Sequence, residues 1–185
     1  RGAASLQYGT QFGGLINFIM KKPNPNKKIE IITRNTLGSK NLYTNFTSVS
    51  LNKNKLSFYG YTNYKIGNGF RINSQFESFN SYAHFDFKIN NKSNITFETT
   101  FLNYLAQQAG GLSDKMFYEN PFQSNRERNW FKVKWLLYNL KYNLKLNNYT
   151  NLSVNIFGLE ASRNALGFRT NRVDQIDSNE ERDLI

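Results

Sequence analysis

The chain has 185 residues, a formal net charge of +11, 39% hydrophobic residues and 16% aromatic residues. So many aromatic residues exclude a disordered chain, which lacks them, and favour β-strands, because Phe and Tyr fit a pleated surface. The sequence contains no cysteine, which excludes disulfides and thiolate metal sites, and no apolar run of about 18 residues, so it offers no transmembrane helix.

The first 23 residues, RGAASLQYGTQFGGLINFIMKKP, are rich in small residues and end in a short apolar stretch and two lysines. We expect the glycines at positions 2, 9, 13 and 14 to supply positive φ angles or close backbone approach. No Gly-Lys-Ser or Gly-Lys-Thr follows them, so the stretch is not a phosphate-binding loop. Residues 21–26 are expected to form a short hinge into the first strand.

From residue 27 onward the sequence predicts alternating strands and turns. Runs rich in β-branched and aromatic residues predict strands at about 28–37, 41–51, 56–66, 80–89, 95–106, 130–146 and 152–162. The segment AHFDFKI, residues 83–89, alternates strictly between apolar residues and His84, Asp86 and Lys88. This period of two predicts one apolar and one polar surface.

The longest predicted strand changes its alternation partway along. Its second part, LLYNLKYNLKLN (136–147), places Leu and Tyr on one face and Asn and Lys on the other. Its first part, WFKVKW (130–135), has apolar residues at the opposite parity. A β-bulge near Trp135, or a strand that projects beyond an apolar band, would explain the change.

The connections between predicted strands are of two kinds. NKNK (52–55), NNKSN (90–94) and NNYTN (147–151) are short and rich in Asn, which tolerates left-handed turn conformations. They alternate with GSK (38–40), two longer connections at 67–79 and 107–129, and a tail from about residue 163. Short turns at one end and long loops at the other are typical of an outer-membrane β-barrel.

The N-terminal stretch resembles the end of the plug domain of TonB-dependent outer-membrane receptors. The matching residues are Arg1-Gly2-Ala3-Ala4-Ser5, Tyr8-Gly9, Gly13-Gly14-Leu15-Ile16-Asn17-Phe18 and Lys21-Lys22. The resemblance implies residues 1–26 as plug end and hinge, and residues 27–185 as the first strands, about seven, of a larger antiparallel transmembrane barrel. Family barrels have about twenty-two strands, so we expect an internal fragment of a larger protein, located in the outer membrane of a Gram-negative bacterium.

A second segment is similar to an extracellular loop of the ferric citrate transporter branch. The matching residues are Gly110-Gly111-Leu112, Tyr118, Pro121-Phe122-Gln123-Ser124 and Arg126. The resemblance implies transport of ferric citrate or a similar siderophore, outer-membrane lipid around the barrel, and the TonB energy-transducing complex as partner. Iron would arrive as a chelate, so no cofactor and no resident metal site are expected.

The resemblance also suggests where ligand and plug make contact. Arginine forks bind carboxylates bidentately and stay charged, so Arg163, Arg169 and Arg172 in the predicted tail are candidate ligands of an anionic chelate. The polar residues Gln107, Gln108 and Arg126 are further candidates. Arg1 is a candidate plug–barrel contact through a wall carboxylate, and His84 is expected to face the lumen or the plug.

Two other classes of function remain open on the sequence. A soluble, basic β-rich protein could bind nucleic acid through stacked aromatic residues and lysines, although the lysines are spread over turns and polar faces without a block of like charges. A passive porin or adhesin barrel would lack the plug signature. No nucleophile or metalloprotease motif is present, so an enzyme is not expected.

Overall fold

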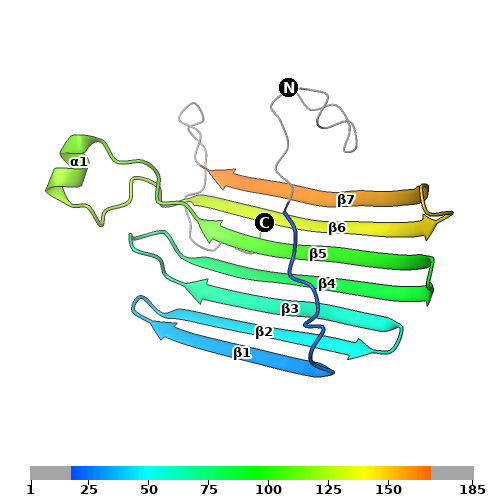
Figure 1. Cartoon of the computed structure of the whole chain (residues 1–185). Coiled ribbons are helices and arrows are strands. Elements are labelled where there is room, and N and C mark those ends of the chain that lie inside the picture. The colour runs from blue at the N-terminus through cyan, green and yellow to red at the C-terminus, as the bar shows by residue number, and fades with distance from the viewer. Residues whose placement is uncertain (1–17, 168–185) are drawn as a thin grey trace.

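The computed structural model describes residues 18–167, and these residues form an all-β structure, as the sequence predicts (Figure 1). Seven strands make a single antiparallel sheet in which every strand pairs with its neighbour in the chain, in the order β1 to β7. The strands are β1 Ile29–Gly38, β2 Leu42–Lys53, β3 Leu56–Gly67, β4 Phe76–Asn90, β5 Ser93–Gln107, β6 Asn129–Lys145 and β7 Asn151–Gly167. Within residues 18–167, no helix is long and apolar enough to cross a membrane.

Two adjacent rows of the sheet show how different its faces are. One row pairs Ser50, Tyr59, His84, Glu98 and Asn139 across β2 to β6. The next row pairs Leu51, Phe58, Phe85, Phe97, Leu140 and Ile156 across β2 to β7. Because successive side chains of a strand point to opposite faces, the first row belongs to what we call the polar face and the second to the apolar face.

Across β2 to β4 the sheet buries side chains of its polar face, and large side chains of its apolar face are exposed. The polar-face side chains Ser48, Ser50, Tyr59, Tyr82 and His84 are each at most 5% exposed. Exposed side chains of the apolar face include Ile29, Ile31, Phe85, Phe87, Phe97, Leu140 and Ile156, the last at 60%. A buried polar residue and an exposed apolar surface are both unusual in a soluble domain and are therefore informative.

The strand β6 is regular where the alternation of its sequence changes. It pairs without a register shift with β5 from Trp130 to Leu144 and with β7 along its whole length. The bulge, one of the two explanations for the change, is therefore absent. Lys132 and Lys134 continue the face on which Leu136 and Tyr138 lie, and Trp130 lies on the same face beyond them.

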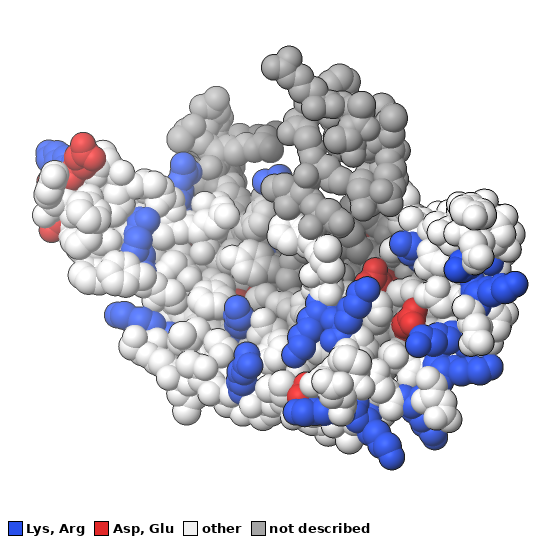
Figure 2. Space-filling view, in the orientation of Figure 1, with Lys and Arg blue, Asp and Glu red and all other residues white. Residues whose placement is uncertain are grey.

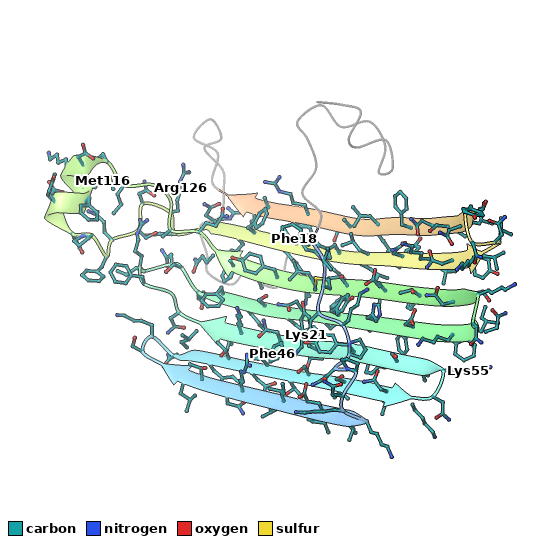
Figure 3. All side chains as sticks on the ribbon, in the orientation of Figure 1. Phe18, Lys21, Phe46, Lys55, Met116 and Arg126 are labelled. Carbon is teal, nitrogen blue, oxygen red and sulfur yellow. The ribbon has the colours of Figure 1, made fainter. Side chains whose placement is uncertain are left out.

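The turns follow the layout expected from the sequence. Residues 54–55, 91–92 and 146–150 connect strands at one end of the sheet, and residues 39–41, 68–75 and 108–128 connect them at the other (Figure 1). Asn54 and Asn41 adopt φ angles of 51° and 56°, the left-handed conformation that Asn tolerates. Figure 3 shows Lys55 at the short-turn end and Arg126 at the long-loop end.

The structure corrects two expectations about the long connections and adds a helix to one of them. The strand β4 begins at Phe76, so the first long loop is shorter than the predicted 67–79. The second long loop contains a short helix, α1 Asp114–Glu119, capped by Ser113, whose hydroxyl accepts a hydrogen bond from the Met116 amide. The strand β7 extends to Gly167, so Arg163 lies in a strand opposite Val133 and not in a tail, because the long strand β6 supplies backbone partners as far as Asn129.

Candidate functional site

The segment of residues 18–28 crosses the polar face and leads into β1 (Figure 1). Its end is anchored to β2: the Asn24 amide donates a hydrogen bond to Ser50 Oγ at 3.1 Å. The side-chain amide of Asn52 donates to the carbonyl oxygens of Asn24 and Lys27. Ser50 and Asn52 thus fix residues 24–27 to the sheet, at the place where the sequence predicts the hinge.

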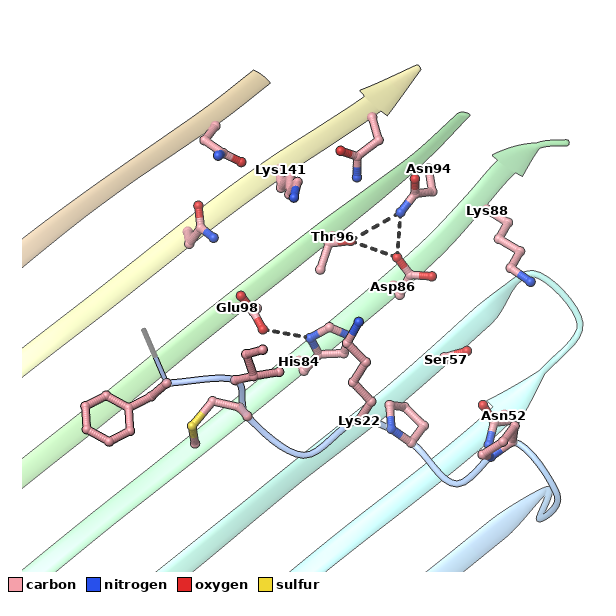
Figure 4. A pocket seen from close by; sticks show the side chains of 18 residues that line it. Lys22, Asn52, Ser57, His84, Asp86, Lys88, Asn94, Thr96, Glu98 and Lys141 are labelled. Carbon is pink, nitrogen blue, oxygen red and sulfur yellow. Dashed lines mark hydrogen bonds and ion pairs between the residues drawn. The ribbon is translucent and has the colours of Figure 1, made fainter. Parts of the chain in front are cut away.

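A cavity of about 600 Å³ lies between this segment and the polar face (Figure 4). The segment contributes Phe18, Ile19, Met20, Lys22, Pro23 and Pro25 to its lining. The sheet contributes polar side chains from β2 to β7: Asn52, Ser57, His84, Asp86, Lys88, Asn94, Thr96, Glu98, Asn139, Lys141, Asn143 and Asn155. The segment side of the cavity therefore mixes apolar and polar side chains, and the sheet side is uniformly polar.

A buried hydrogen-bonded cluster forms one wall of the cavity. His84 Nδ1 lies 3.0 Å from Glu98 Oε1, and the Tyr82 hydroxyl donates to the same oxygen at 2.8 Å. A carboxylate only accepts hydrogen bonds, so in this contact the imidazole carries a proton on Nδ1. Figure 4 shows Lys22 extending from the segment over His84.

Next to this cluster, a second carboxylate, that of Asp86, accepts hydrogen bonds from side chains of β5. Asp86 Oδ1 accepts hydrogen bonds from Asn94 Nδ2 and from Thr96 Oγ1, each at 2.8 Å. Lys88 and Lys141 line the same cavity. The wall therefore offers hydrogen-bond donors and acceptors, and both positive and negative charges, at fixed positions. Such a surface suits a polar peptide segment or a hydrated solute. Within residues 18–167, no group of three His, Cys, Asp or Glu side chains could hold a metal ion.

Basic side chains gather at the short-turn end of the molecule (Figure 2). The connections there contain Lys55 and Lys92, and Lys53 and Lys145 end the adjoining strands. Of these, Lys53 shares a row of the apolar face with Leu56 and Phe87, next to the row of Phe85 and Phe97. A single-stranded nucleic-acid platform needs cations and exposed aromatic rings interleaved on one surface, whereas along β4 the exposed rings of Phe85 and Phe87 lie on the face opposite Lys88.

The candidate ligand residues Gln107 and Gln108 hold the base of the second long loop. Gln107 is 5% exposed, donates through Nε2 to the Glu127 carbonyl at 2.7 Å and accepts from Gln75 Nε2 at 3.3 Å. It shares the face of Phe97 and Phe101, not that of Glu98. The backbone of Gln108 donates to the Asn129 carbonyl at 2.7 Å, and its carbonyl accepts from Asn129 Nδ2 at 3.2 Å.

The arginine candidates are placed differently from one another. Arg126 is exposed on the second long loop. Arg163 is exposed on the polar face of β7, with its guanidinium carbon 4.9 Å from the centre of the Phe131 ring. Arg1, Arg169 and Arg172 lie outside the described residues, as does most of the stretch that resembles a plug domain. Neither Arg126 nor Arg163 lines the cavity under residues 18–25.

Sequence reasoning missed residues that the structure makes central. Glu98 joins Tyr82 and His84, and Arg71 joins the two long loops. The alternation of ITFETTFLNY (95–104) did place Glu98 opposite Phe97, so the strand pattern could have identified it as a polar-face carboxylate. No local pattern identifies Arg71, because its partners are backbone carbonyls distant in the chain.

Comparisons of the chain with protein-family models and with curated protein sequences found no match.

Proposed function

We propose that this chain is part of a TonB-dependent outer-membrane transporter for ferric citrate or a similar ferric chelate. In this proposal, the sheet is the first part of a larger antiparallel transmembrane barrel, and residues 1–26 are the end of its plug and the hinge into the barrel. The observation that carries the proposal is the inverted burial of the sheet, in which His84 is buried on a polar face while Ile156 is exposed on an apolar one.

A lipid-facing wall explains the exposed apolar face. Six residue steps separate Ile95 from Phe101 on that face of β5, which at about 3.4 Å per residue is roughly 20 Å. This length is comparable to the apolar band of about 25 Å on outer-membrane barrels. The polar residues Lys132 and Lys134 on β6 lie beyond the end of this band, on the long-loop side.

The edges of the sheet support a larger assembly. The outer edges of β1 and β7 carry no neighbouring strand among residues 18–167. Unpaired backbone groups are not tolerated in hydrocarbon, where each costs several kcal/mol. In a barrel, further strands of the same protein would pair with both edges.

The anchored segment favours a plugged transporter over a passive porin or adhesin in this proposal. Residues 18–25 cover the polar face, and Ser50 and Asn52 hold the segment's end. We propose that the chelate binds from outside, that the signal passes through the plug, and that the TonB complex pulls the plug by using the proton gradient. The activity is binding and transport, and the partner supplies the energy, so no nucleotide site is required.

The chelate would be recognised by cations near the long-loop end of the barrel. Arg163, Arg169, Arg172 and Arg126 are the proposed contacts, because guanidinium groups form bidentate, charge-assisted hydrogen bonds with carboxylates. Gln107 and Gln108 support this region through the loop base that they bind. His84 and Arg1 are proposed as plug contacts.

Cell fractionation and ligand binding test this function. The intact protein should sediment with the outer membrane and bind ferric citrate in a radioactive-iron assay. Changing Arg163, Arg169 and Arg172 together to Ala should raise the Kd at least tenfold, because one lost charged hydrogen bond costs about 1.5–3 kcal/mol.

The control is Arg34→Ala, which removes another strand arginine whose guanidinium lies over an aromatic ring, 5.8 Å from the centre of Phe46. Recovery of the protein in the cytoplasm would refute the membrane location. An unchanged Kd in the triple variant would refute the assignment of these arginines.

A further inference from the structure

The two long loops are joined by one arginine from the first of them. Arg71, in residues 68–75, donates from Nη1 to the Gly110 carbonyl at 2.7 Å and from Nε to the Gln123 carbonyl at 2.9 Å. Its Nη2 also donates to the Ala109 carbonyl at 3.3 Å. These three carbonyls come from both ends of the second loop, residues 108–128, so one guanidinium binds that loop at its beginning and near its end.

Other contacts between the loops surround Arg71. The Ile72 amide donates to the Phe122 carbonyl at 3.1 Å, and the Phe70 and Phe122 rings lie 4.9 Å apart. Asn73 Nδ2 donates to the Arg126 carbonyl at 3.0 Å. Four consecutive residues, 70–73, therefore contact the second loop by different interactions, and one of these contacts fixes the main chain of Arg126.

The backbone of both loops is shaped for these contacts. Asn73 has a φ of 54°, which lets its side-chain amide reach the second loop. Gly110 has a φ of +76°, and a Cβ there would lie 2.6 Å from Arg126 Cγ. Because a side chain at position 110 would displace Arg126 or Asn125, the carbonyl bound by Arg71 and the position of Arg126 depend on the same residue.

We propose that Arg71 is a positioning residue that makes the two long loops one preformed unit and thereby sets the position of Arg126 for an anionic ligand. The part concerning the ligand rests on the function proposed above. A planar guanidinium with five N–H donors can serve three carbonyls at once, whereas a lysine ammonium is a compact point charge without a fixed fork. In this proposal the two loops bind the ligand as one unit, and the second loop does not move over the ligand independently of the first.

Hydrogen exchange of the intact protein tests the joined loops without any ligand. In Arg71→Lys and Arg71→Ala, peptides containing the amides of Ile72 and Asn125, which donate to the Phe122 and Ala109 carbonyls, should exchange at least tenfold faster. Lys115→Ala is the matched control, because it removes a loop cation that lies 3.9 Å from Glu119 on α1 and is otherwise exposed. Exchange within twofold of the wild type in both Arg71 variants would overturn the proposal.

A double-mutant cycle tests the positioning of Arg126. With ferric citrate as the probe, Arg71→Lys should raise the Kd at least fivefold in the wild type and leave it unchanged when Arg126→Ala is already present. Equal effects in both backgrounds, or no effect in either, would overturn the positioning role. If the wild type binds no ferric citrate, the proposed function fails, and the exchange rates decide by themselves whether Arg71 joins the loops.

Discussion

His84 Nδ1 lies 3.0 Å from Glu98 Oε1, at directly paired positions of β4 and β5. The same carboxylate oxygen accepts a hydrogen bond from the Tyr82 hydroxyl at 2.8 Å. His84 is 5% exposed and Tyr82 is 4% exposed, so one carboxylate satisfies two buried groups. His84 and Glu98 line the cavity under the segment that leads into β1.

Replacing Glu98 by Ala should lower the free energy of unfolding by about 1–2 kcal/mol, because two buried donors lose their acceptor. Glu98→Gln retains an acceptor oxygen and should cost less. Urea unfolding of the refolded protein measures both values. An alanine variant as stable as the wild type would show that Tyr82 and His84 find other partners.

An added charge should destabilise the protein on one face of β6 and be tolerated on the other. Leu140→Arg places a cation on the apolar face and should destabilise a membrane-inserted protein by about 2–4 kcal/mol. Asn139→Arg is the matched control, since the neighbouring residue lines the polar cavity and should tolerate the change. The measurement is the fraction folded in lipid vesicles; equal losses for the two variants would contradict a lipid-facing apolar surface.

Gly158 provides the space for the ring of Tyr138, which is directly opposite on β6. A Cβ at position 158 would overlap the outer end of the exposed Tyr138 ring, so Gly158→Val should displace this ring at a cost of about 1 kcal/mol, the lower end of the range for overpacking. In a Tyr138→Ala background, the same substitution should cost much less. Unfolding free energies of the four variants give the coupling, and strict additivity would contradict the contact.

Asn52 should control the mobility of the segment over the polar face. Asn52→Ala removes the two side-chain hydrogen bonds to the carbonyls of Asn24 and Lys27, so residues 18–28 should become more mobile. The sequence lacks cysteine, and Ile19 is 83% exposed, so Ile19→Cys accepts a nitroxide label. Its electron paramagnetic resonance spectrum should sharpen in the Asn52 variant.

Asn155→Ala is the control for this experiment, because Asn155 lines the same cavity from β7 without belonging to the anchor on β2. An unchanged spectrum in Asn52→Ala would mean that Ser50 or the covalent connection to β1 holds the segment alone.

The number and order of the strands, and the side chains that share a face of the sheet, follow from local sequence patterns, whereas the start of β4 and the end of β7 do not. The period of two in residues 83–89 and 136–147 fixes which side chains share a face, because successive residues of a strand point in opposite directions. The short Asn-rich turns also follow from local chemistry, since Asn54 adopts the left-handed conformation that its side chain tolerates. Such features depend on a residue and its near neighbours in the chain.

The contacts between distant parts of the chain could be found only from the folded structure. The choice between a bulge and a projecting strand at Trp135 depended on the backbone partners that β5 and β7 offer. Arg71 joins the long loops through backbone carbonyls. Because every residue has a carbonyl, the residue types in the second loop do not predict which ones bind Arg71. His84 likewise lines a cavity with the segment of residues 18–28, a long-range arrangement held by a hydrogen bond that Ser50 accepts and by two that Asn52 donates.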